Sequence, residues 1–339
     1  MFDFIPDVVF LFAFGLLLLI KGGDWFVDAA TNIAKRFKLP ELLIGATVVS
    51  IGTTLPEVMT SAMAAVGGSG EIAYGNAVGS IICNTSLIAA ITIAIKPAKA
   101  ARRNLIFPIC TFFAVAAFYA LNAYAFGGFE RWAGIILLAC FVVYMVTTVI
   151  NMIKNPVEAD ASSDEHLECE LHEESEEGSV LKDVLILLGG ALVIALGAHL
   201  LVNSAKEIAA MMNIPDSVIA LTVVALGTSL PELVTAITAL SKGHGALSLG
   251  NIIGANIFNL VLVSGVSFTI SPFAMEDSST LFGANSSLAL DIPVMLAVMG
   301  IMTIPTLIRG KLSRWQGFLL LAIYVAYTAV QFIFVKTVA

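Results

Sequence analysis

Charged side chains are scarce in this chain. They make up 12% of its 339 residues, whereas hydrophobic side chains make up 58%. A soluble domain has about a quarter of its residues charged, so this composition excludes an ordinary soluble protein. An α-helix crosses a bilayer with roughly 20 apolar residues, and the chain is long enough for about ten such helices with their connections. We therefore predict an all-α membrane protein.

Cysteine is also rare. The chain has four cysteines, three of them inside apolar runs: Cys83, Cys110, Cys140 and Cys169. Such scattered positions indicate neither a disulfide framework nor a zinc site, and we expect no cofactor. The first apolar run, from Val8 to Ile20, lacks a basic leader and a cleavage signal, so we expect a first membrane span rather than a signal peptide.

Ten apolar segments follow one another, five on each side of an acidic stretch. They cover approximately residues 5–22, 40–66, 72–95, 105–126, 132–153, 181–203, 215–241, 246–272, 286–307 and 315–336. The chain therefore divides into a first transmembrane repeat at 1–153, an acidic linker at 154–180 and a second transmembrane repeat at 181–339. The linker holds ten of the 25 acidic residues, which leaves the rest of the chain near neutral and excludes a nucleic-acid partner.

Basic residues predict the orientation. If each segment crosses once, 14 of the 17 lysines and arginines lie at connections on one side, and only Arg131, Lys206 and Lys336 lie opposite. The positive-inside rule places the basic side and the linker in the cytoplasm and both termini outside. We expect a multi-pass protein of the bacterial inner (plasma) membrane. It is expected to be monomeric, with the lipid bilayer and inorganic cations as its partners.

The two halves are repeats of each other. Pro40 and Pro215 are 175 positions apart, and the same offset continues without a gap to Asn84 and Asn259. With five spans in each half, the second copy is inserted upside down. Inverted repeats with breaks in matched helices are typical of secondary transporters, whose substrate site lies near the midplane between the repeats.

A carboxylate motif occurs once in each copy. Residues 52–57 have the sequence Gly-Thr-Thr-Leu-Pro-Glu, and residues 227–232 have the sequence Gly-Thr-Ser-Leu-Pro-Glu. A carboxylate in hydrocarbon is costly, so Glu57 and Glu232 need a partner or a function. Proline lacks an N–H group and glycine weakens a helix. We therefore expect helices two and seven to be broken, helix two between residues 50 and 56.

These segments offer the ligands of a hard cation. Calcium takes six to eight oxygen ligands from carboxylates, carbonyls and waters. Each copy supplies one carboxylate, two hydroxyls and freed carbonyls: Glu57, Thr53 and Thr54 in the first copy, and Glu232, Thr228, Ser229 and the Ala225 region in the second. A single copy could instead be a proline-kinked helix whose glutamate bonds a neighbour. Two copies at one offset favour a cation cage.

Spans three and eight add matching amides and glycines. Ser80 and Asn84 are four residues apart and share one face of a helix. We expect Asn84 and its counterpart Asn259 to be ligands, whereas Asn76 and Asn251 bond either the ion or the backbone. Gly-xxx-Gly pairs at 75/79 and 250/254 let another helix approach closely.

The Gly-Thr-[Thr/Ser]-Leu-Pro-Glu and Gly-Asn-x-x-Gly-[Ser/Ala] segments are similar to the α-repeats of the calcium/cation antiporter superfamily. The branch they resemble is that of bacterial calcium/sodium antiporters related to the potassium-dependent sodium/calcium exchangers. The resemblance extends over the ten-helix layout and is most specific at residues 40–90 and 215–265. It implies that Glu57 and Glu232 bind calcium and are shared with competing sodium, and that spans one and six slide. The other ligands that it implies are Thr53, Thr228, Thr54, Ser229, Ser80, Asn84, Asn259 and the carbonyls of Ser50 and Ala225.

Three positions depart from the family pattern. Asn259 stands where an aspartate is often found, Ala255 where a serine is expected, and Ile81 where an asparagine is often found. One outer monovalent site is therefore poorer in oxygen and charge. This leaves the stoichiometry open, and the counter-ion open between sodium, protons and potassium. In potassium-dependent members an acid near position 259 is linked to potassium, so Asn259 argues against potassium dependence.

These features predict a secondary active transporter that exchanges calcium for sodium by alternating access. The alternatives are a calcium/proton antiporter, in which the carboxylates carry protons, and a cation channel, against which the lack of a symmetric pore motif counts. We do not expect enzyme activity, because Thr53 and Ser229 have no histidine nearby in the sequence.

Outside the cage, Asp24 and Asp28 are expected to form a polar cluster at the membrane interface. Asp291, near the membrane surface, is not expected to be a ligand.

Overall fold

The structure is a computed structural model that describes residues 5–68, 70–98, 101–154, 180–211, 225–275, 279–281, 284–334 and 336–337. It is nearly all helical. The helices of the first half are α1 (Ile5–Arg36), α2 (Glu41–Ile44), α3 (Ser50–Val66), α4 (Gly70–Cys83), α5 (Ala90–Ile95), α6 (Arg102–Ala125) and α7 (Arg131–Lys154). Those of the second half are α8 (Val180–Met211), α10 (Ala225–Thr228), α11 (Leu230–Ser241), α12 (Gly245–Phe258), α13 (Ser264–Ile270), α14 (Ile292–Arg309) and α15 (Arg314–Phe334). The predicted acidic linker lies almost wholly outside the described residues.

Four π-helical segments also occur in the described part of the chain. They are η1 (Gly45–Val49), η2 (Asn84–Ala89), η4 (Asn259–Val263) and η5 (Ser287–Asp291). A π-helical turn widens the backbone by one residue, and such turns are frequent at functional sites. The first three join α2 to α3, α4 to α5 and α12 to α13, so that each makes one long, locally widened helix.

Eight helical stretches of the described residues are long and apolar enough to cross a membrane. They are Asp7–Arg36, Glu41–Val66, Gly70–Ile95, Arg102–Ala125, Arg131–Lys154, Val180–Ser204, Gly245–Ile270 and Ser287–Arg309. Each overlaps one of the ten predicted segments, although the first, predicted at 5–22, continues to Arg36. The other two predicted segments contain α11 and α15, and the count of ten spans stays a prediction.

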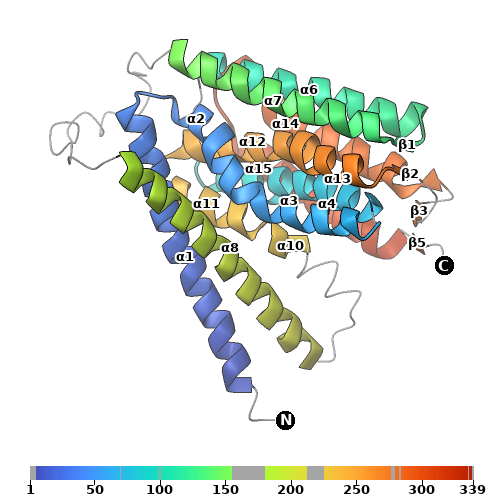
Figure 1. Ribbon diagram of the computed structural model, residues 1–339, viewed down its shortest axis with the longest axis horizontal. Helices are drawn as coiled ribbons and strands as arrows, with labels where there is room; N and C mark the ends of the chain where they lie inside the picture. Colours follow the sequence, from blue (N-terminus) through green and yellow to red (C-terminus); the bar gives the residue numbers. More distant parts are fainter. Residues whose placement is uncertain are drawn as a thin grey trace.

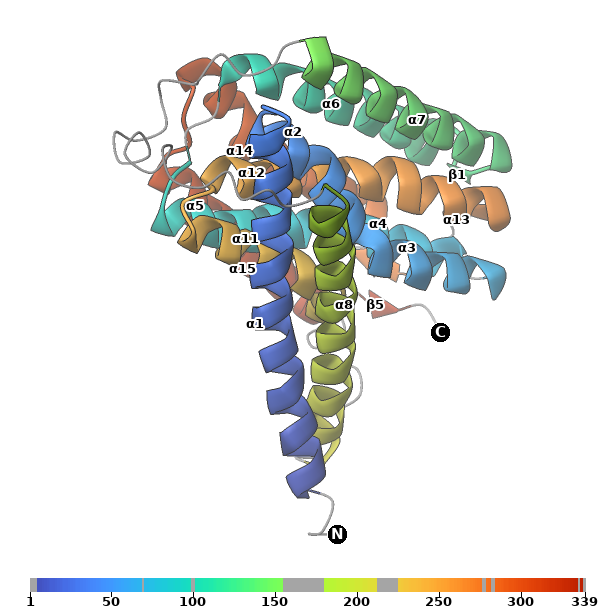
Figure 2. The same cartoon turned by 60° about the vertical axis from the view of Figure 1, so that its left-hand side comes forward.

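Helices α1 and α8 form a pair that stands apart from the other helices. Each has 32 residues, and the two run side by side, steeply inclined to the rest of the bundle (Figures 1 and 2). A Cβ added at Gly15 would lie 2.9 Å from the Gly197 carbonyl oxygen, and one added at Gly197 would lie 2.8 Å from the Gly15 carbonyl oxygen. The two backbones therefore touch with no side chain between them, as small residues allow in membrane helices.

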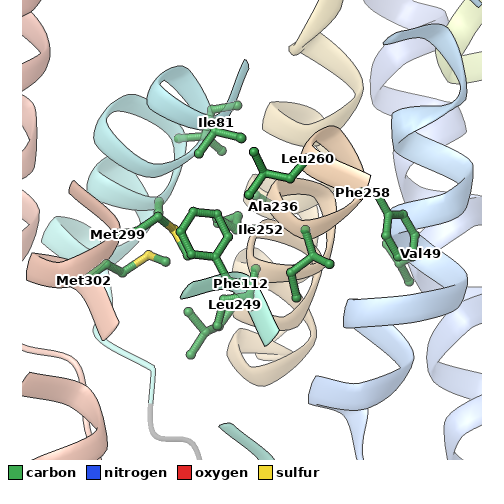
Figure 3. Packing of buried hydrophobic residues seen from close by; sticks show 14 of the residues in the cluster. Val49, Ile81, Phe112, Ala236, Leu249, Ile252, Phe258, Leu260, Met299 and Met302 are labelled. Carbon is green, nitrogen blue, oxygen red and sulfur yellow. The ribbon is translucent and has the colours of Figure 1, made fainter. Parts of the chain in front are cut away.

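Helix α12 lies at the centre of the bundle. Helices α12 and α13 together form the candidate span Gly245–Ile270. In the apolar stretch of this span 89% is buried, a larger share than in any other candidate span of the described residues. Figure 3 shows its residues Leu249 and Ile252 among the buried side chains of Phe112, Met299 and Met302. Such close packing fixes α12 as the element against which the first-half helices are placed.

Glycine contacts set the distance between α12 and the start of α3. A Cβ at Gly250 would lie 2.0 Å from the Leu42 carbonyl oxygen, and a Cβ at Gly45 would lie 2.3 Å from the Leu247 carbonyl oxygen. The predicted close approach at the 250/254 pair is therefore confirmed. At the 75/79 pair, no atom of the described residues lies within 4 Å of an added Cβ.

The predicted opening of helix two between residues 50 and 56 is wrong. Helix α3 is continuous from Ser50 to Val66 with Pro56 inside it, and the irregular turn is η1, upstream at Gly45–Val49. Hydroxyl groups explain the position of this turn. Ser50 Oγ donates to the Gly45 carbonyl at 2.8 Å, and Tyr144 Oη of α7 donates to the Ala46 carbonyl at 3.1 Å. Side-chain donors from Ser50 and Tyr144 thus bond carbonyls of the wide turn, whereas proline removes only one donor.

The second copy is interrupted, as expected for helix seven. Helix α10 ends at Thr228 and α11 begins at Leu230, so the interruption lies at Ser229, which has φ −92° and ψ 6°. Pro231 stands in the first turn of α11, where the missing N–H group would have had no helical partner in any case. The interruption places Glu232 at the beginning of a helix.

Short strands depart from the all-α prediction. β1 (Gly128–Phe129) pairs antiparallel with β2 (Phe273–Ala274). β3 (Ser279–Leu281) pairs antiparallel with both β4 (Ala284–Asn285) and β5 (Lys336–Thr337). These strands have only two or three residues and join connections between helices to one another and, through β5, to the segment that follows α15. They gather at one end of the bundle, on the right of Figure 1, which we call the strand end.

Candidate cation site

Two buried carboxylates from opposite halves of the chain form the centre of the site. Glu57 lies on α3 and Glu232 in the first turn of α11, and both have 0% of their surface exposed. The two carboxylates interact electrostatically. None of their four oxygens has a hydrogen-bond partner among the described residues. Two like charges without partners in a buried place are strongly unfavourable unless a cation or a proton joins them.

Hydroxyl groups of α3 face the second-half carboxylate. Thr53 and Thr54 are 1% and 0% exposed, and their hydroxyl groups lie beside the Glu232 carboxylate and interact with it. Thr54 Oγ1 has no partner among the described residues. Two predicted ligands of the first copy, Thr53 and Thr54, therefore lie beside the carboxylate of the second copy.

The hydroxyls of the second copy lie at the interruption of its helix. Ser229 is 1% exposed, and its Oγ has no hydrogen-bond partner among the described residues. Thr228 is half-buried at the end of α10, and Ala225 is the first residue of α10. These two predicted ligands therefore stand on the far side of the interruption from Glu232.

The predicted amide ligands begin two of the π-helical turns. Asn84 is the first residue of η2 and Asn259 the first residue of η4, and both are 0% exposed. Neither the oxygen nor the nitrogen of either amide has a partner among the described residues. Ser80, one turn before Asn84, is 4% exposed. Leaving such groups unbonded costs about 1–3 kcal/mol each, so this set of orphaned atoms fits a bound ion.

Asn251 joins the first-copy ligands to α12, a role that the sequence left open. Its side-chain oxygen accepts hydrogen bonds from Thr53 Oγ1 at 3.2 Å and from Ser50 Oγ at 3.3 Å, and its carbonyl accepts from Ser50 Oγ at 3.0 Å. Its repeat counterpart Asn76 instead donates to Ser61 Oγ at 2.8 Å. Asn251 therefore positions Thr53 and Ser50, whereas Asn76 has no such part.

Two further residues lie at the site that the sequence pattern did not indicate. The Cys83 thiol, just before Asn84, is 6% exposed and lies near Ser229 and within the electrostatic field of both glutamates. Tyr144 of α7 bonds the Ala46 carbonyl in η1. Spacing could not reveal either residue, because each reaches the site from a helix face that carries no repeated motif.

The donor set is suited to hard cations. It consists of two carboxylates with neutral hydroxyl, amide and carbonyl oxygens. No group of three or more histidine, cysteine, aspartate or glutamate side chains converges in the described part of the chain. Hard cations such as Ca²⁺ take oxygen ligands, and two carboxylates match the charge of one divalent or two monovalent ions.

Comparison with known proteins shows that the chain as a whole is similar to ion exchangers. Residues 8–150 and 182–333 match the family model described as sodium/calcium exchanger protein. The chain is 32% identical over 345 residues to the sodium/calcium exchanger MaX1 of Methanosarcina acetivorans, covering 94% of this chain and 96% of that protein. It is 34% identical over 317 residues to an uncharacterized membrane protein of Methanocaldococcus jannaschii, with 93% and 94% covered.

A solved structure supports the same comparison. The fold resembles that of the sodium-calcium exchanger NCX_Mj, soaked with 10 mM Na⁺ and no Ca²⁺, with a TM-score of 0.78 and 32% identity. The match covers 96% of this chain and 99% of that one. Other structures of the same exchanger were obtained after soaks that included Ca²⁺ or Sr²⁺.

Proposed function

The chain belongs to the sodium/calcium exchanger protein family, and on this basis we propose that it exchanges Ca²⁺ for Na⁺ across a membrane as a secondary active transporter. One observation carries the proposal. Glu57 and Glu232 are wholly buried, interact with each other and have no hydrogen-bond partner among the described residues. A transported cation supplies the charge that this pair lacks.

The proposed cage uses both copies of the repeat. Its ligands are the side chains of Glu57, Glu232, Thr53, Thr228, Thr54, Ser229, Ser80, Asn84 and Asn259 and the carbonyls of Ser50 and Ala225. The orphaned amides and hydroxyls support this set, because six to eight oxygens are what Ca²⁺ requires. Sodium uses part of the same set, so one kind of ion occupies the cage at a time. That competition couples the two fluxes.

The proposed architecture has ten spans in two inverted repeats, at 1–153 and 181–339, joined by the acidic linker at 154–180. Backbone contacts between α1 and α8 support the repeat relationship. A Cβ at Gly15 would lie 2.9 Å from the Leu201 nitrogen, and a Cβ at Gly190 would lie 3.0 Å from the Phe26 nitrogen. Gly190 follows Gly15 by 175 positions, and Leu201 follows Phe26 by the same number. One contact is therefore made twice, with the two helices exchanged.

Alternating access follows if α1 and α8 move as a unit. The glycine contacts make this pair a compact body, and Figure 2 shows it inclined across the other helices. Sliding of the pair would open the cage to one side and then to the other. A pair of ionised glutamates without a cation resists the passage through a closed, dry state, which prevents empty return.

The proposed setting is a bacterial inner membrane. The basic connections favour a cytoplasmic linker and both termini outside. The protein would act as a monomer on inorganic cations, with no enzyme activity. Asn259 in place of an acid favours Na⁺ over K⁺ as the counter-ion.

Reconstituted vesicles test the function. Purified protein is placed in vesicles loaded with Na⁺, and uptake of ⁴⁵Ca²⁺ is followed with and without an outward Na⁺ gradient. We expect gradient-dependent uptake that falls to background in Glu57→Gln and Glu232→Gln. Removing one carboxylate from its buried ion pair with Ca²⁺ costs about 3–5 kcal/mol, which corresponds to at least a hundredfold loss of Ca²⁺ affinity.

The control is Glu130→Gln, which changes an exposed carboxylate in the β1 to α7 connection. It should retain full uptake. Uptake that needs no Na⁺ gradient, or that survives in both cage variants, would refute the proposal.

The second candidate function is calcium/proton exchange. It is favoured by the bare carboxylates themselves, which can be satisfied by protons as well as by Na⁺. The same vesicles distinguish the two functions. A pH gradient without Na⁺ drives uptake only for the proton antiporter, and a Na⁺ gradient at equal pH drives uptake only for the sodium antiporter.

A further inference from the structure

A fourth π-helical turn lies outside the cation cage. The turns η1, η2 and η4 adjoin or contain the cage residues Ser50, Asn84 and Asn259. The remaining π-helical turn of the described residues is η5, which ends at Asp291. It opens the span Ser287–Arg309 and contacts β3 and β4 at the strand end of the bundle. A wide turn, of a kind that is frequent at functional sites, therefore also lies beside a carboxylate with no assigned role.

Asp291 is held by side chains of a neighbouring helix. Its Oδ1 accepts hydrogen bonds from Tyr327 Oη at 3.0 Å and from Gln331 Nε2 at 2.7 Å, both on α15. Gln331 Nε2 also lies 3.1 Å from Tyr327 Oη. Ser287, one turn earlier in η5, approaches the same carboxyl group. The carboxylate is thus fixed in place on one oxygen.

Among the described residues, no cationic side chain forms an ion pair with Asp291. The ion pairs found within the described residues join Arg36 to Asp183, Lys242 to Asp24 and Asp28, and His244 to Glu41. None of them includes Asp291, whose contacts are neutral hydroxyl and amide groups. A partly buried carboxylate in a membrane span marks a functional site by default, with a cation or a proton as its complement.

Tyr74 adds an orphaned oxygen from a third element. It lies on α4 and is 2% exposed, and its Oη has no hydrogen-bond partner among the described residues. Its ring is held by Tyr119 and Phe129, each with a ring centroid 5.8 Å away. The hydroxyl faces Ser287 and interacts electrostatically with Asp291. A buried, fixed hydroxyl without a partner beside an unpaired carboxylate indicates a missing ligand.

We propose that Asp291, Ser287, Tyr74 and Tyr327 form a binding site for a monovalent alkali cation, separate from the Glu57–Glu232 cage. One carboxylate and several neutral oxygens match an ion of charge +1. The cage differs because its two carboxylates match a divalent ion. The inference goes beyond the proposed exchange and does not depend on it.

The test uses protein whose cage has been disabled. In the Glu57→Gln/Glu232→Gln variant, the thermal unfolding midpoint is measured in detergent while NaCl or KCl replaces choline chloride at constant ionic strength. A bound cation raises the midpoint in a saturable way. We expect a rise of a few degrees with Na⁺ or K⁺, and the more effective of the two ions identifies the alkali cation that the site prefers.

Further variants on the same background locate the site. Asp291→Asn should abolish the cation-dependent rise, and Tyr74→Phe should shift it to several-fold higher cation concentration while the ring contacts remain. Glu130→Gln should leave it unchanged. The proposal is overturned if no alkali cation raises the midpoint of the parent variant, or if the rise persists in Asp291→Asn and Tyr74→Phe. It is equally overturned if the midpoint responds to pH but to neither cation, which would make Asp291 a proton site.

Discussion

Gly254 lies so close to Ser50 that a Cβ at position 254 would stand 2.2 Å from the Ser50 Oγ. The same Cβ would stand 2.6 Å from the Cα of Ala46. Only hydrogen fits at this point, where α12 of the second copy meets the start of α3 in the first. The contact therefore sets the separation between the two helices that carry Asn259 and Glu57.

Gly254→Ala should destabilise the protein and lower its Ca²⁺ affinity. The added methyl group must displace Ser50, whose hydroxyl bonds Gly45 and Asn251, or push the backbone of Ala46 away. Overpacking of this kind costs about 1–3 kcal/mol. Thermal unfolding and the concentration dependence of ⁴⁵Ca²⁺ uptake measure the two effects.

The matched control is Gly300→Ala on α14, where an added Cβ meets only the Ile304 Cδ1, at 3.6 Å. Alanine also has the higher helix propensity, so this variant should be at least as stable as the parent. Equal unfolding midpoints for the two alanine variants would contradict the assigned role of Gly254.

Asn251→Ala should weaken Ca²⁺ binding while the fold persists. It removes the acceptor of Thr53 and Ser50, and Thr53 is a proposed ligand. Loss of one such hydrogen bond costs about 1 kcal/mol, or roughly a fivefold rise in the Ca²⁺ concentration for half-maximal uptake. Asn76→Ala, at the repeat counterpart, should have a smaller effect because Asn76 bonds Ser61. If the two variants behave alike, Asn251 is not a positioning residue.

Tyr144→Phe should also lower Ca²⁺ affinity by roughly fivefold. The variant keeps the ring contacts with Phe107 and Phe258 but leaves the Ala46 carbonyl in η1 without its donor. A buried carbonyl without a donor costs about 1–3 kcal/mol, and some of that cost is relieved by movement of the turn that precedes Ser50. Tyr124→Phe, which removes an exposed hydroxyl bonded to Leu288, serves as the control. If Tyr144→Phe binds Ca²⁺ as tightly as the parent protein, the hydrogen bond from Tyr144 is not needed to hold η1 in shape.

The sequence was sufficient to predict the family and the burial of the central residues. Glu57 and Glu232 could be found because carboxylates in apolar runs are rare and these two recur at one offset. The break at helix seven was predicted from Gly227 and Pro231, and the structure has an interruption at Ser229, between α10 and α11. Eight of the ten predicted segments overlap helices able to span a membrane.

The local backbone of helix two could not be predicted in the same way. The Gly-x-x-x-Pro pattern at 52–56 suggested an opening at these residues, yet α3 is regular and the wide turn is η1. The deciding donors, Ser50 and Tyr144, act through contacts between distant parts of the chain. A pattern within one helix contains no information about a hydroxyl that arrives from α7. Asn251 was left undecided for the same reason.

The predicted polar cluster at the end of span one is an ion-pair network between helices. Lys242, which follows α11, lies 3.3 Å from Asp24 Oδ1, 2.8 Å from Asp28 Oδ1 and 3.2 Å from the Asp24 carbonyl oxygen. It joins α1 to the main bundle. Arg36 and Asp183 form a second pair at 3.4 Å, but this one joins α1 to α8. If α1 and α8 slide as a unit, the first network must break in every transport cycle, whereas the second can persist.

Lys242→Gln should therefore change the transport rate, and Arg36→Gln should not. The three side chains at Lys242 are 27%, 37% and 58% exposed, so the network contributes at most about 1 kcal/mol. Its loss should raise the maximal rate of ⁴⁵Ca²⁺ uptake by up to about fivefold wherever release of α1 limits the cycle. High salt should produce the same acceleration in the parent protein but not in Lys242→Gln, because salt screens exposed ion pairs. An identical change of rate in both variants would mean that α1 and α8 do not move together, since only a rigid pair leaves the Arg36 contact undisturbed.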